Sequence, residues 1–350
     1  MTFYEIFILS CYKSGYPMRM STLYHLLKGK KTSSVLTYGY FYDNLNYFNL
    51  LPKLKEKSYY NLIEKLIQKE CLIEVEKGIL GLSETGVRIL GEKSFPTLSQ
   101  LNQMEYYKYD MTFWEKIMFA TQVISEKSYH EGKYIPIENN LFKQQQLKKW
   151  LKSQNETLPS QFYKEWEKIL DFIPEDKQVL LLRQLVGHNH IGLTLNQIAI
   201  EKEQDYFYTY LEFKNCLHYF IQMIEEHLTE YPIFHELLAL EKSLVKTDSS
   251  QVSNQLYRQY GSVSQVSQYR RLKESTVTDH LIESFLRQPS LSNLPKFNEN
   301  TIAALEKLKL SQPDFRRWLF KDACMYEAEL SFYDFKCYQF YLVEKEKLND

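Results

Sequence analysis

The sequence of 350 residues is poor in the residues that interrupt helices. It contains 11 glycines and 10 prolines, and this scarcity favours helices over a fold built of hairpins. Its five cysteines are widely spread and include no Cys-x-x-Cys pair, which argues against a disulfide framework and against a zinc ribbon. We therefore expect a mainly α fold with a small β-hairpin, and reduced cysteines in its core.

Long apolar runs and a targeting segment are also missing. No stretch approaches the roughly 18 apolar residues that a bilayer-spanning helix needs. The N-terminal residues Met-Thr-Phe-Tyr-Glu lack the basic region of a signal peptide. These absences predict a cytoplasmic protein with no membrane contact.

Motifs that carry catalysis are absent as well. The sequence has no GxSxG, HExxH or GxGxxG motif and no acidic metal triad. The run from Lys28 to Thr32 looks like a phosphate loop, but Tyr24 stands where a Walker A motif needs its first glycine. His188 and His190 are two residues apart and would not share a helix face, so a metal site is not expected. We predict a non-enzymatic protein without cofactor or metal.

The length of the chain suggests two or three domains. The first 93 residues combine short helices with a strand pair, Leu72–Val75 and Ile79–Leu82, joined at a turn that ends in Gly78. This pattern predicts a winged-helix-like domain. The expected organisation is a winged-helix-like domain over 1–93, a linker over 94–107, a helical middle domain over 108–245, and a helix-turn-helix domain with a C-terminal helix over 246–350.

Aromatic residues are concentrated in the middle and at the C-terminus. Tyr206, Phe207, Tyr208 and Tyr210 stand on a predicted helix, where such residues normally pack into a core. A long helix is expected from about Pro313 to Lys347. Its aromatics are too many for one exposed surface, so we expect it to dock onto the rest of the chain or onto a partner.

The segment 256–288 has the pattern of a helix-turn-helix. Val266 and Ser267 form the apolar-small pair of a second helix, and a turn follows over 270–274. Three apolar residues recur at every fourth position of the third helix and so share its inward face: Val277, Leu281 and Phe285. Thr276 and Asp279 have the spacing of a capping box at its start. The opposite face carries Thr278, Ile282 and Glu283.

The start of the third helix carries groups suited to DNA. In a helix-turn-helix the N-terminal residues of the last helix meet base edges, while flanking cations hold phosphates. The candidate contacts of this segment are Arg270, Arg271, Lys273, Thr276 and Thr278. Between Arg258 and Arg287 five cations face three acids, a net charge of +2. So small a charge predicts weak, salt-sensitive binding and a second contact surface.

The N-terminal region offers that second surface. Residues 1–60 contain eight lysines and arginines and three acids, a net charge of +5. The densest part supplies the candidate phosphate contacts Lys28, Lys30, Lys31 and Thr32. We therefore expect DNA to be held at both ends of the molecule. A solvated turn remains the alternative for this loop.

Two stretches of the sequence resemble the YpbB-type proteins of low-GC Gram-positive bacteria. They run from Val266 to Leu281 and from Tyr24 to Thr32. The C-terminal part of that family is a helicase-associated helix-turn-helix, also found in some RecQ-type helicases. The resemblance implies a non-enzymatic DNA-binding accessory to a RecQ-type helicase in DNA repair or recombination. It adds Ser275 and His280 to the candidate contacts, since Arg270, Ser275, Thr276 and His280 match the motif, whereas Ser267 replaces its alanine.

Two other functions fit the same sequence. A sequence-specific transcription regulator would prefer one duplex site strongly and bind as a dimer across two half-sites. A protein adaptor would use the helix-turn-helix fold to hold a partner instead of DNA.

Overall fold

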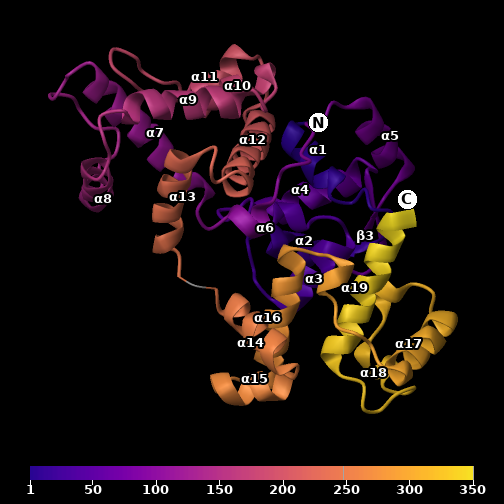
Figure 1. The fold of residues 1–350 in the computed structure, drawn as a ribbon. Coiled ribbons are helices and arrows are strands. Elements are labelled where there is room, and N and C mark those ends of the chain that lie inside the picture. The colour runs from indigo at the N-terminus through magenta and orange to yellow at the C-terminus, as the bar shows by residue number, and fades with distance from the viewer. Residues whose placement is uncertain (247, 350) are drawn as a thin grey trace. The chain divides into compact units, whose positions relative to one another are not determined.

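The computed structural model describes residues 1–246 and 248–349 and is mainly helical with a small β-hairpin (Figure 1). The fold class predicted from the sequence is therefore confirmed. Over the described residues, no helix is both long and apolar enough to cross a membrane. The chain divides into two compact units: unit 1, Met1–Pro17 with Lys57–Lys246, and unit 2, Met18–Glu56 with Thr247–Asp350.

This division differs from the domains expected from the sequence. Residues 1–93 do not form one N-terminal unit, because residues 18–56 fold with the C-terminal part of the chain. The reason is the packing of helix α3 (Ser33–Phe41) on helix α16 (Glu274–Arg287). Packing between segments so distant in the chain leaves no local signal in the sequence.

The hairpin lies in unit 1 and has the predicted form. Strands β2 (Leu72–Glu76) and β3 (Ile79–Leu82) pair antiparallel with Leu72 opposite Leu82. Gly78 in the turn has a φ of 74°, a conformation that favours glycine, and its N–H donates to Glu74 Oε1 at 2.7 Å.

Helices make up the rest of unit 1. In chain order they are α1 (Phe3–Ser10), α4 (Glu56–Gln68), α5 (Glu84–Glu92), α6 (Gln103–Tyr106), α7 (Asp110–Ser128), α8 (Leu141–Lys152), α9 (Leu158–Leu170), α10 (Glu175–Leu182), α11 (Leu195–Glu201), α12 (Tyr206–Glu226) and α13 (Pro232–Leu244). Helix α6 lies inside the segment 94–107, which the sequence suggested was a linker.

Aromatic packing joins the N-terminal helix of unit 1 to α12. The ring of Phe207 lies 5.1 Å from that of Phe7 and 6.1 Å from that of Phe3, and Tyr208 lies 4.9 Å from Phe3. For Phe207 and Tyr208 the predicted packing role is confirmed, whereas Tyr206 is half exposed.

A buried polar cluster also joins α7 to α12. The Asp110 carboxylate accepts hydrogen bonds from the Lys214 ammonium and, at 2.9 Å, from His218 Nε2. The Asn102 backbone N–H donates to His218 Nδ1 at 2.9 Å. Nδ1 must then be unprotonated, so His218 is the neutral tautomer with its proton on Nε2. Burial lowers the pKa of His218 to about 4, against the raising effect of its hydrogen bond to Asp110.

Unit 2 combines an early segment with the C-terminal part of the chain. Its elements are β1 (Met18–Arg19), α2 (Met20–Leu27), α3, the 3-10 turn η1 (Leu45–Tyr47), α14 (Ser249–Tyr260), α15 (Val263–Arg270), α16, η2 (Leu291–Asn293), α17 (Glu299–Ser311), η3 (Phe315–Arg317), α18 (Phe320–Ala323) and α19 (Phe332–Asn349).

One prediction for this unit is wrong. The single helix expected from Pro313 to Lys347 is divided into η3, α18 and α19, because Ser331 starts a new helix: its Oγ accepts from the Asp334 N–H at 3.0 Å. The expected docking is confirmed, since the Phe340 ring of α19 stacks on Phe285 at 5.0 Å.

Candidate nucleic-acid interface

Helices α14, α15 and α16 form the predicted helix-turn-helix in unit 2. Gly261 ends α14 with a φ of 68°, and Ser262 caps α15 by accepting from the Gln265 N–H. Arg271 follows α15 with a φ of 54°, and the Leu272 N–H donates to the Ser267 carbonyl at 3.0 Å. These contacts fix the tight turn before α16.

The predicted inward face of α16 is confirmed. Val277, Leu281 and Phe285 are buried. Helix α16 packs on α14 and α15, and Phe285 also stacks on Phe340 of α19. Burial of this apolar stripe holds α16 against its neighbours.

The opposite face of α16 is not open to DNA. Thr278, Ile282 and Glu283 are also buried, because α3 and α19 pack against α16 as well. Thr278 is therefore removed from the candidate contacts. The residues of α16 that stay exposed are Glu274, Ser275 and Asp279 in its first half, and two of these carry carboxylates, which do not favour a phosphate backbone.

The predicted cap of α16 is also wrong. The helix begins at Glu274, and Lys273 occupies the N-cap position without a side-chain capping bond. Thr276 already lies in the first turn and is only partly exposed, while Ser275 is exposed.

Arg270 and His280 are occupied inside the helix-turn-helix. Arg270 Nη1 donates to the Ser249 carbonyl at 2.7 Å and to Ser253 Oγ at 2.5 Å. Ser253 Oγ lies 2.9 Å from His280 Nδ1. Burial, and then the charge of Arg270, lower the pKa of His280, so the imidazole stays neutral at physiological pH. Both side chains fasten α14 to its neighbours.

The basic loop between α2 and α3 lies in the same unit as the helix-turn-helix. Lys31 Nζ lies 2.6 Å from Glu283 Oε1 and 3.3 Å from Asp248 Oδ2. Arg287 Nη2 completes this ion network at 2.6 Å from Asp248 and 3.0 Å from Glu283. Lys31 is thus engaged in holding unit 2 together.

The other candidates of this loop have separate surroundings. Thr32 caps α3 by accepting from the Val35 N–H at 3.4 Å. Lys28 Nζ lies 5.9 Å from the Tyr24 ring centroid, a cation–π distance. Lys30 is exposed. The two basic motifs of the sequence therefore meet at the start of α14, where Lys31 contacts Asp248 and Arg270 contacts Ser249.

Six predicted contacts are exposed: Lys30, Lys31, Thr32, Arg271, Lys273 and Ser275. Two of them, Lys31 and Thr32, are engaged in the ion network and in the cap of α3. Sequence reasoning missed two exposed neighbours, Arg258 and Tyr269. One signal was available: the sequence from Ser249 to Lys273 contains four cations and no aspartate or glutamate, although the chain has 44 acids. Helices α14 and α15 thus present a surface without carboxylates, which we call the acid-free surface.

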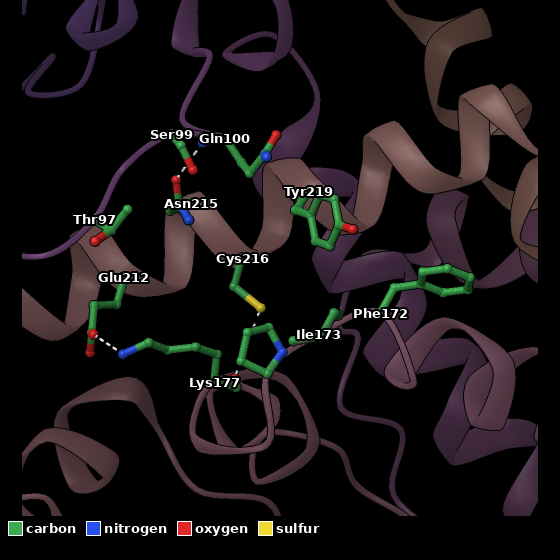
Figure 2. Close-up of a pocket in the computed structure, with 11 residues that line it drawn as sticks. Thr97, Ser99, Gln100, Phe172, Ile173, Lys177, Glu212, Asn215, Cys216 and Tyr219 are labelled. Carbon is green, nitrogen blue, oxygen red and sulfur yellow. Dashed lines mark hydrogen bonds and ion pairs between the residues drawn. The ribbon is translucent and has the colours of Figure 1, made fainter.

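A cavity in unit 1 is a weaker candidate for a binding site. It has a volume of about 310 Å³ and is lined by residues that include Gln100, Lys177, Glu212, Asn215 and Cys216 (Figure 2). Its charged groups engage one another, since Lys177 pairs with Glu212. The Gln100 N–H also donates to Asn215 Oδ1 at 2.9 Å. Burial raises the pKa of the Cys216 thiol to about 12, so the thiol is not a nucleophile.

The histidine pair in unit 1 has a local role. His188 Nδ1 lies 2.8 Å from Glu126 Oε2, and the Tyr129 ring stacks on it at 4.5 Å. Within residues 1–246 and 248–349, no group of three or more His, Cys, Asp or Glu side chains is arranged to hold a metal ion.

Comparison with known proteins gives one informative relative. The chain is 24% identical over 301 residues to Protein YpbB of Bacillus subtilis (strain 168), covering 83% of this chain and 84% of that protein. This similarity supports membership of the YpbB-type family. No family model and no solved structure matches the chain.

Proposed function

We propose that this chain is a non-enzymatic DNA-binding protein of the cytoplasm that supports a RecQ-type helicase in DNA repair or recombination. The observation that carries the proposal is the acid-free surface. Four cations, Arg258, Arg270, Arg271 and Lys273, lie in the 25 residues from Ser249 to Lys273, which contain no aspartate or glutamate. A polyanion is the partner that such a surface attracts.

The mode of binding follows from which side chains are exposed. Arg258, Arg271 and Lys273 are exposed, whereas Thr278 and Ile282 of α16 are buried. Phosphate contacts fix a protein on DNA without reading its sequence. We therefore propose sequence-independent binding. With Thr278 and Ile282 buried, α16 has few side chains left to read the bases of a major groove, which argues against a regulator that uses this helix.

The helicase partner rests on the resemblance to the helicase-associated helix-turn-helix. Arg270 and His280 form hydrogen bonds within the fold, so few exposed side chains remain to contact phosphates. Few contacts mean weak binding at physiological salt. A helicase that holds the same DNA would raise the effective concentration of this surface.

The test is the salt dependence of DNA binding by the full chain. Fluorescence anisotropy with labelled DNA of random sequence gives the slope of log affinity against log salt. In the double variant Arg271→Ala/Lys273→Ala we expect this slope to fall by about one unit for each lost phosphate contact. Lys148→Ala/Lys149→Ala, which removes two exposed lysines of α8 in unit 1, is the matched control and should keep the slope. An unchanged slope in the first variant refutes the proposed interface.

A protein adaptor remains the second candidate, because unit 2 also exposes apolar side chains. Leu319 and Met325 are exposed around α18, and such side chains can anchor a protein partner. The adaptor function predicts that the full chain binds no DNA at any salt concentration, which the same titration decides.

A further inference from the structure

Two tyrosines stand among the cations of the acid-free surface. Tyr269, on α15, is 66% exposed, and Tyr260, at the end of α14, is 37% exposed. Their ring centroids are 5.7 Å apart with an angle of 44° between the rings. Most of the Tyr269 ring is therefore open to solvent, with Tyr260 supporting it from one side.

Two cations belong to the same elements as the tyrosines. Arg258 stands on α14 with Tyr260, and Arg271 directly follows α15, which carries Tyr269. All four side chains are exposed. Aromatic rings interleaved with cations, and no carboxylate among them, form the surface that a single strand uses: bases stack on the rings and phosphates meet the cations.

The same features disfavour a duplex. In a duplex the bases already stack on one another and show only their edges, so an exposed ring on a helix has nothing to stack on. On α16, the helix that would read those edges, Thr278 and Ile282 are buried, and two of the residues that stay exposed, Glu274 and Asp279, carry carboxylates.

We infer that Tyr269, supported by Tyr260, is a stacking platform for the bases of single-stranded DNA. This inference rests on the proposed function and specifies the form of DNA that the acid-free surface binds. Tyr269 supplies the stacking contact, while Arg258, Arg271 and Lys273 hold the phosphates on either side of the stacked base.

The experiment measures the affinity of the full chain for three labelled probes. The first is an oligothymidylate of about 15 nucleotides, within the length that single-strand-binding folds cover. The others are a duplex of the same length and an oligothymidylate with abasic sites in place of its bases. The variants are Tyr269→Ala and Tyr269→Phe. Tyr163→Ala is the matched control, since Tyr163 is 62% exposed on α9 of unit 1. Circular dichroism checks that each variant is folded.

We expect the single strand to bind more tightly than the duplex. Tyr269→Ala should weaken single-strand binding about tenfold, the typical loss for one stacked base, without changing the salt slope. Tyr269→Phe and Tyr163→Ala should bind like the native chain. The abasic probe should bind weakly, and Tyr269→Ala should weaken it no further.

Each contrary result has a distinct meaning. Native affinity of Tyr269→Ala for the single strand, or an equal loss on the abasic probe, overturns the stacking platform. If Arg271→Ala/Lys273→Ala still lowers the salt slope in that case, the proposed function stands. If no probe binds at all, the proposed function fails and this inference fails with it.

Discussion

Lys30 and Lys31 are neighbours in the chain but should have opposite roles. Lys31 contacts two carboxylates that are nearly buried, Glu283 and Asp248, whose side chains are 9% and 10% exposed. Lys30 is exposed to solvent. Replacing each with methionine, which retains much of the aliphatic stem, separates a structural cation from a candidate DNA contact.

The cost of Lys31→Met can be bounded from the ion network. Exposed ion pairs contribute up to about 1 kcal/mol, whereas breaking a buried pair costs about 3–5 kcal/mol. Lys31 lies between these limits, because its side chain is 28% exposed and Arg287 still faces both carboxylates after the substitution. We therefore expect unit 2 to lose about 1–3 kcal/mol of stability.

Hydrogen exchange read by mass spectrometry measures this loss locally. Peptides from α14 and α16 should exchange about tenfold faster for each 1.4 kcal/mol lost in Lys31→Met, while peptides from unit 1 in the same digest serve as the reference. Lys30→Met should leave exchange unchanged and lower the salt slope of DNA binding by about one unit. The reasoning is refuted if Lys31→Met lowers the salt slope and leaves exchange in α14 and α16 as it was.

The remaining predictions concern the buried cluster of Asp110, Lys214 and His218 in unit 1. The stability of unit 1 is measured by tryptophan fluorescence during urea unfolding. A Trp318→Phe background leaves the tryptophans of unit 1 as the signal: Trp114, Trp150 and Trp166. Asp110→Asn leaves the buried Lys214 ammonium without its counter-charge and should cost about 3–5 kcal/mol of stability, whereas Lys214→Met should cost less. The double variant Asp110→Asn/Lys214→Met should be more stable than Asp110→Asn, and equal or lower stability would contradict the proposed cost of the unpaired charge. Because the folded pKa of His218 is lowered to about 4, the unfolded chain binds the proton more readily, so stability is complete above about pH 6.5 and falls by about 3 kcal/mol towards pH 4. His218→Gln, whose amide does not titrate, should flatten urea-unfolding stability over this window, and an unchanged pH dependence would exclude His218 as its source.

Local signals in the sequence predicted individual elements well. The hairpin followed from two short apolar runs around Gly78, and the inward face of α16 followed from the spacing of Val277, Leu281 and Phe285. Turn chemistry and apolar periodicity act over a few residues, so they can be read without knowing the rest of the fold.

Capping signals show where this reasoning stops. Thr276 with Asp279 and Ser331 with Asp334 share the same spacing, yet only Ser331 starts a helix. The difference comes from hydrogen bonds that the capping pattern does not include. Ser267 Oγ donates to the Leu272 carbonyl at 2.5 Å, and the Leu272 N–H donates to the Ser267 carbonyl. These bonds fix the turn before α16, so the helix begins at Glu274 and Thr276 lies in its first turn.

The candidate site depended most on contacts that the sequence does not show. The partners of Lys31 are 217 residues away at Asp248, and Arg270 points inward to Ser249 and Ser253. A cation count treats such residues like exposed ones. The net charge of a segment therefore overstated the proposed DNA surface. Even the acid-free segment 249–273 includes Arg270 beside the three exposed cations Arg258, Arg271 and Lys273.

The placement of the two basic motifs also changes how affinity should arise. The sequence suggested two weak sites at opposite ends of the chain, each raising the effective concentration of the other. In the structure both motifs belong to unit 2 and meet at the start of α14, so fragments covering 1–93 or starting at 251 would each cut through one folded unit. Two linked sites on distant domains then cannot raise the affinity for DNA, and the few exposed cations of unit 2 should set that affinity. Under the proposed function, such a surface is useful only where another DNA-bound protein holds the chain, which is the situation that the proposed helicase partner would provide.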